Sequence, residues 1–144
     1  MLIIGGIFTD NKQKFSLWFE ESKNDFEMAQ ILFSAKKYNG AVFYYVQSAE
    51  KAIKALLFYC NLTPWGHSIL NLFEEYENLN NEVDLSLKKI AQDLSRNYIT
   101  SRYPDFSIKI APKDVYNIES AQDIRNKAKI IIDFVNNEME AKNE

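Results

Sequence analysis

The sequence is poor in the residues that interrupt helices and in those that build disulfides or metal sites. It has only four glycines and three prolines in 144 residues, which argues against a loop-rich or all-β fold and favours long helices. Its single cysteine, Cys60, cannot form an internal disulfide, which fits a reducing cytoplasmic location. One histidine, His67, with one cysteine offers no paired ligand spacing, so we expect no metal site.

The sequence also lacks an excess of positive charge and any long apolar run. Its net charge of −3 argues against a surface that is basic overall and binds polyanions everywhere. The sequence has no Walker-type or dinucleotide-binding glycine motif, so we expect no bound cofactor. The apolar N-terminal run at 1–8 is too short to span a bilayer and lacks the basic start of a signal peptide. We therefore expect no membrane association, a short apolar N-terminal segment at 1–13 and one domain at 14–140.

Helical periodicity dominates the rest of the chain. The composition is 47% hydrophobic and 26% charged, as in ordinary globular domains, and the length suits one domain with its own core. Apolar residues recur at the spacing of amphipathic helices. Helices are expected at 14–35, at 41–60, after Ser68, after Asp84 and from Asn117 or Ile118. The predicted fold is all-α, an antiparallel up-and-down bundle of four to five helices.

The helix expected at 41–60 is apolar on more than one side. Phe43, Tyr44 and Phe58 lie away from its main apolar stripe, as in a helix that is central in a bundle or lies in an interface. With the apolar N-terminus, this predicts a homodimer. A narrow polar stripe remains, and it admits two interpretations, a solvated face or the wall of a groove. The stripe consists of Gln47, Glu50, Lys51 and Lys54.

One stretch of this acidic chain is basic. Residues 88–113 carry a net charge of +4, which leaves −7 for the rest, and Tyr98, Tyr103 and Phe106 are interleaved with the cations. Residues 102–112 have no helical period, and a connection of this length in a compact domain is either functional or disordered. Its aromatic and apolar content argues against disorder. We therefore expect this connection to carry a function.

A ligand site is predicted around this stretch. Cations beside aromatic planes suit a phosphate and a stacked base, so the expected ligand is a nucleotide or RNA. The alternative is a structural clasp in which Asp105 pairs with Arg102. The candidate residues are Arg96, Tyr98, Arg102, Tyr103 and Asp105, with Gln47, Lys51 and His67 as second contributors.

Three sequence elements in this order resemble the HEPN domain family. They are the Gln-x-Ala-Glu-Lys-Ala run at 47–52, Gly-His-Ser at 66–68 and Arg-Tyr-Pro-Asp at 102–105. The resemblance covers about residues 15–135. It implies a helical bundle that dimerises and often works beside a minimal nucleotidyltransferase. Some members of the family are ribonucleases, including toxins of toxin–antitoxin pairs.

The chain departs from the signature of the ribonuclease members, an arginine followed after four to six residues by a histidine. The only histidine, His67, precedes Arg96, Arg102 and Arg125. No catalytic residue is therefore assigned. The favoured interpretation is a non-catalytic binding protein that acts with a nucleotidyltransferase partner in a toxin–antitoxin-like system.

Two alternatives remain open at this stage. One is an atypical ribonuclease that uses Arg96, Tyr98, Arg102 and His67, and the other is a purely structural homo-oligomer. An imidazole is the usual group for proton transfer near neutral pH, so the first alternative depends on where the fold places His67.

Overall fold

The computed structural model describes the backbone of residues 2–143 and the side chains of residues 10–143. Over this range the prediction of an all-α fold is confirmed. Its helices are α1 (Leu2–Ser34), α2 (Tyr38–Tyr59), α3 (Ile69–Glu77), α4 (Leu85–Thr100), α5 (Pro112–Val115) and α6 (Ile118–Lys142). Between residues 2 and 143, none of these helices is both long and apolar enough to cross a membrane.

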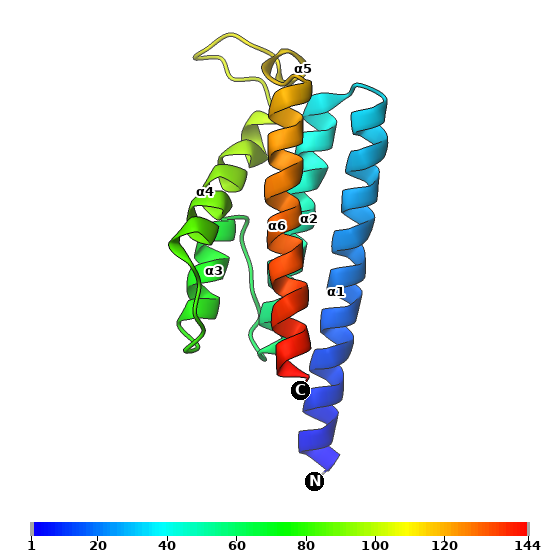
Figure 1. Ribbon diagram of the computed structural model, residues 1–144, viewed down its shortest axis with the longest axis vertical. Helices are drawn as coiled ribbons and strands as arrows, with labels where there is room; N and C mark the ends of the chain where they lie inside the picture. The colour runs from blue at the N-terminus through cyan, green and yellow to red at the C-terminus, as the bar shows by residue number, and fades with distance from the viewer. Residues whose placement is uncertain (1, 144) are drawn as a thin grey trace.

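The long helices run up and down, as predicted. Successive long helices α1, α2, α4 and α6 alternate in direction, and the short α3 lies beside α4 (Figure 1). The loop after α2 folds back along the bundle before α3 begins, and the connection from α4 to α5 protrudes at one end. This arrangement places the start of α3 next to the middle of α4.

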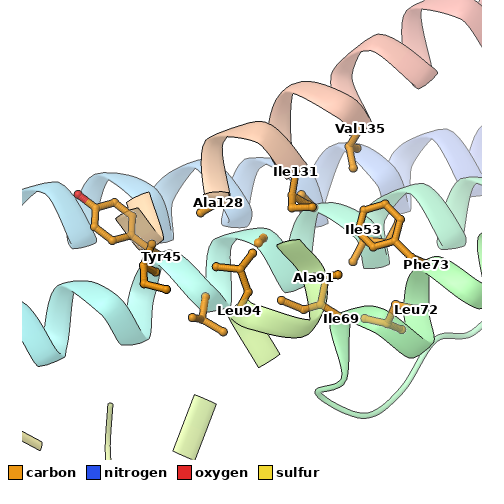
Figure 2. Close-up of a cluster of buried hydrophobic side chains, with 14 of the residues drawn as sticks. Tyr45, Ile53, Ile69, Leu72, Phe73, Ala91, Leu94, Ala128, Ile131 and Val135 are labelled. Carbon is orange, nitrogen blue, oxygen red and sulfur yellow. The ribbon is translucent and has the colours of Figure 1, made fainter. Parts of the chain in front are cut away.

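The central element is α2, which contacts α1, α3, α4, α5 and α6. Thirteen of its 22 residues are buried, which explains why the sequence is apolar on more than one side. The core gathers side chains from α1, α2, α3, α4 and α6, and Figure 2 shows part of it. It includes Tyr45 and Ile53 of α2, Leu72 and Phe73 of α3, Leu94 of α4, and Ile131 and Val135 of α6. Phe43, Tyr44 and Phe58, which lie away from the main apolar stripe, are only half-buried by the bundle, and the homodimer stays a prediction.

Helix α1 begins at Leu2, whereas the sequence predicted a start near residue 14. The prediction was wrong because nothing between Ile7 and residue 14 breaks a helix. An ion pair of 3.0 Å between Lys14 and Asp10, one turn apart, lies across the expected boundary. The apolar side chains at positions 2–8 lie outside the described residues.

Helix α2 begins at Tyr38, three residues before the start predicted at residue 41. The actual break is the turn before it, where Lys36 adopts a φ of 62°. Gly40 lies inside α2, and a Cβ there would be 3.2 Å from Leu32 Cδ1. The glycine therefore permits α1 and α2 to approach closely.

Helices α3, α4 and α6 begin where the sequence predicted, directly after Ser68, Asp84 and Asn117. The Ser68 side chain accepts a hydrogen bond from Asn71 N, and Asn117 forms a reciprocal capping box with Ser120. Asp84 is the N-cap residue of α4, but its side chain makes no capping hydrogen bond. These caps fix where α3 and α6 begin, and therefore where the loop containing His67 ends.

Candidate functional site

His67 lies where the chain enters α3. Gly66, with a φ of +85°, makes the turn that only glycine adopts readily, and Ser68 then caps the helix. Ile69 N donates a 3.0 Å hydrogen bond to Ser95 Oγ of α4. Because this bond joins the start of α3 to α4, the imidazole comes to lie beside Tyr98, one turn further along α4.

The His67 ring is held from two sides. Its Nδ1 lies 3.1 Å from Glu50 Oε1, and its plane stacks on the Tyr98 ring with 4.4 Å between centroids and 16° between planes. The carboxylate favours the tautomer with the proton on Nδ1, which leaves Nε2 as the free acceptor. Tyr98 Oη lies 3.3 Å from Nε2, but the rings are nearly parallel, so this contact is stacking rather than a directed hydrogen bond.

Glu50 connects His67 to a buried ion pair. Its side chain is only 4% exposed, and Oε2 accepts a 3.0 Å hydrogen bond from Lys54 Nζ, which also lies 5.9 Å from the Trp18 ring centroid. The predicted polar stripe of α2 is therefore not a solvated face. His67 itself is 55% exposed at the outer end of this chain of contacts. No three His, Cys, Asp or Glu side chains within residues 10–143 group closely enough to hold a metal ion.

Arg102 lies just beyond the end of α4, which is tied to α2. Asn39 Nδ2 donates to the carbonyl of Ser101, the C-cap residue of α4, at 3.4 Å. The Arg102 guanidinium carbon then lies 4.9 Å from the ring centroid of Phe43 and 5.6 Å from that of Tyr103. Both distances are within the range of cation–π contacts.

Phe43 joins the two halves of the site. Its ring centroid is 6.1 Å from that of Tyr98, which stacks on His67. A continuous, partly exposed cluster thus runs from the start of α3, over α4 and α2, to the start of the protruding connection. We call it the His67–Arg102 face, and it consists of Phe43, His67, Tyr98, Arg102 and Tyr103.

The two candidate site residues of α2, Gln47 and Lys51, lie on different surfaces. Gln47 is half-buried and lies, by helical spacing, between Phe43 and Glu50 on the same side of α2, so it belongs beside the His67–Arg102 face. Lys51 does not, because its Nζ forms a 2.8 Å ion pair with the buried Asp25 of α1. Lys51 therefore links α1 to α2.

Arg96 also lies apart, on the side of α4 that faces α6. It lines a groove of about 430 Å³ there and contacts Asp93 at 3.4 Å. In the same groove Lys127 bonds to Asp123 at 2.8 Å and to Asp93 at 3.2 Å, and chiefly the Asp123 hydrogen bond raises the pKa of Lys127. Arg96 and Arg102 thus belong to different surfaces.

Asp105 does not pair with Arg102, so the alternative of a clasp between these two residues is wrong. Its carboxylate accepts hydrogen bonds from Ser107 N at 2.8 Å and Ser107 Oγ at 2.5 Å. The hydroxyl bond, with the backbone bond second, lowers the pKa of Asp105. Across residues 10–143, Arg102 takes part in none of the ion pairs. Its guanidinium is therefore available to an anion.

Sequence reasoning missed Phe43 and Glu50 as members of the site. The signal for both was present, because Phe43 precedes Gln47 by four residues and Glu50 follows it by three, the two spacings that share a helix face. The sequence could not show that the loop after α2 returns to place His67 against that face.

Comparisons with known proteins agree with this architecture. The HEPN domain family matches residues 15–138. A "Putative toxin" of Methanocaldococcus jannaschii is 26% identical over 131 residues, which cover 83% of this chain and 86% of the relative.

Solved structures are similar along most of the chain. A Thermus thermophilus protein has a TM-score of 0.82 at 29% identity and covers 86% of this chain and 97% of its own. An archaeal HEPN homologue has a TM-score of 0.72 at 30% identity, with coverages of 86% and 96%. A HEPN domain protein of Thermotoga maritima has a TM-score of 0.69 at 27% identity, with coverages of 85% and 97%. Sequence match and bundle architecture together show that this chain belongs to the HEPN domain family.

Proposed function

We propose that this HEPN domain is a binding protein that holds a nucleotide or RNA on the His67–Arg102 face. The observation that carries the proposal is the environment of the Arg102 guanidinium. Its guanidinium is exposed, lies over the rings of Phe43 and Tyr103, and has no carboxylate partner among residues 10–143. A positioned arginine with free donors is suited to bidentate contact with a phosphate.

The neighbouring side chains supply the other contacts that such a ligand requires. Tyr103 is 52% exposed, so one side of its ring is free to stack on a base. His67 offers a second polar contact across the Phe43–Tyr98 pair. Residues 88–113 carry a net charge of +4 in an otherwise acidic molecule, which attracts a polyanion to this stretch of the chain.

The biological setting that we propose is a toxin–antitoxin-like pair with a nucleotidyltransferase partner. The resemblance to the family implies such a partner, and the Methanocaldococcus jannaschii relative is named a putative toxin. The proposed role in this pair is binding rather than catalysis, because no arginine of the chain is followed by a histidine at the ribonuclease spacing.

A titration tests the binding proposal. ATP and a short single-stranded RNA are titrated against the wild type, Arg102→Lys and Tyr103→Ala, with melting measured in parallel. We expect Arg102→Lys to weaken binding about tenfold or more, since hydrogen bonds to charged groups contribute roughly 1.5–3 kcal/mol. The free energy of unfolding of each variant should stay within about 0.5 kcal/mol of the wild-type value, because both side chains are exposed.

Arg125→Lys is the matched control for this titration. Arg125 also lies over a phenylalanine ring, that of Phe33 at 5.2 Å, but at the contact of α1 and α6. The Arg125→Lys variant should bind ATP and RNA as tightly as the wild type does. Equal loss in both arginine variants, or no wild-type binding to either ligand, would contradict the proposal.

The geometry also favours a second candidate, an atypical ribonuclease. Its supporting observation is the 3.1 Å contact between His67 and the buried Glu50, since a carboxylate that orients an imidazole is a common arrangement in general acid–base catalysis. Arg102 would stabilise the charge that develops on the phosphate. Arg96, which faces α6, has no place in this version of the site.

Purified protein incubated with transfer RNA and a chelator separates the two candidates. Intact RNA supports the binding role. Cleavage that is abolished by His67→Ala and by Arg102→Ala, but retained in Arg125→Lys, would replace the binding role with the ribonuclease.

A further inference from the structure

A hollow of about 230 Å³ opens beside His67, between the loop that leads into α3 (Figure 1) and one face of that helix. Trp65 and His67 line it from the loop. The residues that line it from the helix side share one helical face and are Ser68, Asn71, Leu72 and Glu75. The volume is below the usual range of small-molecule pockets, roughly 300–1,000 Å³, so the hollow suits one flat ring system rather than a whole nucleotide.

The indole of Trp65 is presented to solvent at the edge of this hollow. Pro64 before it is buried, and Gly66 after it makes the turn with a φ of +85°. The Trp65 side chain is 85% exposed, and it takes part in none of the ring–ring or cation–π contacts among residues 10–143. A flat ring without a partner in its own fold is the kind of surface on which bases of single-stranded RNA stack.

The rest of the hollow combines an apolar residue with polar ones. Leu72 is 1% exposed, whereas Asn71 and Glu75 are exposed and lie one helical turn apart. The Glu75 carboxylate makes none of the ion pairs within residues 10–143. A free carboxylate accepts hydrogen bonds and repels phosphate, so the hollow suits the base of a nucleotide and not its phosphate.

We propose that this hollow receives one guanine of a single-stranded RNA that lies along the His67–Arg102 face. The inference rests on the binding function proposed above and narrows its ligand. His67 lines the hollow and also belongs to the His67–Arg102 face, so the two are continuous. The combined site has an exposed ring at each end, Tyr103 beside Arg102 and Trp65 beside His67. A mononucleotide has a single base, so only an oligonucleotide fills both ends.

The carboxylate of Glu75 is the group that selects guanine. Guanine presents two neighbouring donors on its Watson–Crick edge, N1–H and the 2-amino group, which match the two oxygens of a carboxylate. Adenine, cytosine and uracil each place an acceptor next to their donor on that edge, and a carboxylate repels such an acceptor. Stacking on an aromatic ring together with hydrogen bonds to this edge is a common way to recognise a base in single-stranded RNA.

Fluorescence anisotropy with labelled hexauridylate, and with the same RNA carrying one guanosine, tests the selectivity. The wild type should bind the guanosine-containing RNA at least about fivefold more tightly. Glu75→Gln should remove this preference and keep the affinity for hexauridylate. Glu74→Gln is the matched control, because Glu74 is also exposed on α3 but does not line the hollow, and it should keep the preference. Inosine in place of guanosine should lose most of the preference, since inosine lacks the 2-amino group.

Trp65→Ala tests the stacking in the same titration. It should weaken binding of both RNAs at least about fivefold, whereas Trp65→Phe should keep most of the affinity. The melting temperature should not change, because the indole is exposed. Wild-type affinity in Trp65→Ala, or a guanosine preference that is absent from the wild type or survives in Glu75→Gln, overturns the inference. If Arg102→Lys still loses RNA in that case, the proposed function stands without the base pocket. A wild type that binds neither RNA overturns both.

Discussion

The ring of Tyr98 lies flat against the imidazole of His67, although the two residues are 31 positions apart in the chain. The contact exists because the loop after α2 returns to α4, where Ser95 accepts a hydrogen bond from Ile69 N. On its other side His67 meets Glu50, and Tyr98 meets Phe43. Side chains from three segments thus form one partly exposed surface around a single histidine.

The placement of the arginines predicts an asymmetry in ligand binding. Arg102→Ala should weaken nucleotide or RNA binding at least tenfold, because Arg102 lies on the His67–Arg102 face. Arg96→Ala should leave affinity within about twofold, because Arg96 lines the groove between α4 and α6. Fluorescence anisotropy with a labelled RNA measures both variants. Comparable losses in the two would move the site to the α4–α6 groove or extend it around α4.

The buried Glu50–Lys54 pair should be important for stability. Glu50→Gln keeps the size of the side chain but leaves Lys54, which is 7% exposed, without its counter-charge. Breaking a buried pair from one side costs about 3–5 kcal/mol, so chemical denaturation should show a loss of this order. Asp133→Asn is the control, because its pair with Lys129 at 3.7 Å is exposed and should matter by less than about 1 kcal/mol. Equal losses of unfolding free energy in Glu50→Gln and Asp133→Asn would mean that water reaches the Glu50–Lys54 pair.

Two adjacent isoleucines of α6 offer a direct test of the core. Ile131 is fully buried between helices, whereas its neighbour Ile130 is 44% exposed. Ile131→Ala should lower the free energy of unfolding by about 2–5 kcal/mol, because it removes packing and leaves a cavity. Ile130→Ala should change it by about 0.5 kcal/mol or less. Urea denaturation of both variants gives the comparison, and a reversed order would place the wrong face of α6 against the bundle.

Tyr116 predicts a loss of stability at alkaline pH. Burial raises the pKa of its phenol to about 12, above the value of about 10 for an unfolded chain. Because the folded state holds the proton more tightly, the stabilisation is complete below about pH 10 and is lost as the pH rises towards 12. This stabilisation is on the order of 3 kcal/mol, because each pKa unit corresponds to about 1.4 kcal/mol.

Melting of the wild type and Tyr116→Phe between pH 8 and 12 measures this effect. The variant loses the 2.7 Å hydrogen bond to Asn97, so it should be somewhat less stable at pH 8. Its further decline above pH 10 should be shallower, because one buried phenol no longer ionises. Parallel curves for the two proteins would show that Tyr116 ionises as easily in the folded chain as in the unfolded one.

The sequence by itself determined the fold class and the starts of α3, α4 and α6. Apolar spacing of 3.6 residues and the scarcity of glycine and proline require helices, and the short side chains of Ser68 and Asn117 cap α3 and α6 where predicted. These are local effects of neighbouring residues. The ordered connection after α4 was also foreseeable, because its aromatic content argues against disorder.

Only the tertiary structure decided which candidates share a surface. Lys51 turned to Asp25 of another helix, and Glu50 met His67 through a loop that returns from the far end of α2. Asp105 bonded to Ser107 rather than Arg102, because a partner two residues away needs less ordering of the chain than a distant one. Such choices depend on which partners the packed helices bring within about 3 Å, and that distance is set by the fold as a whole.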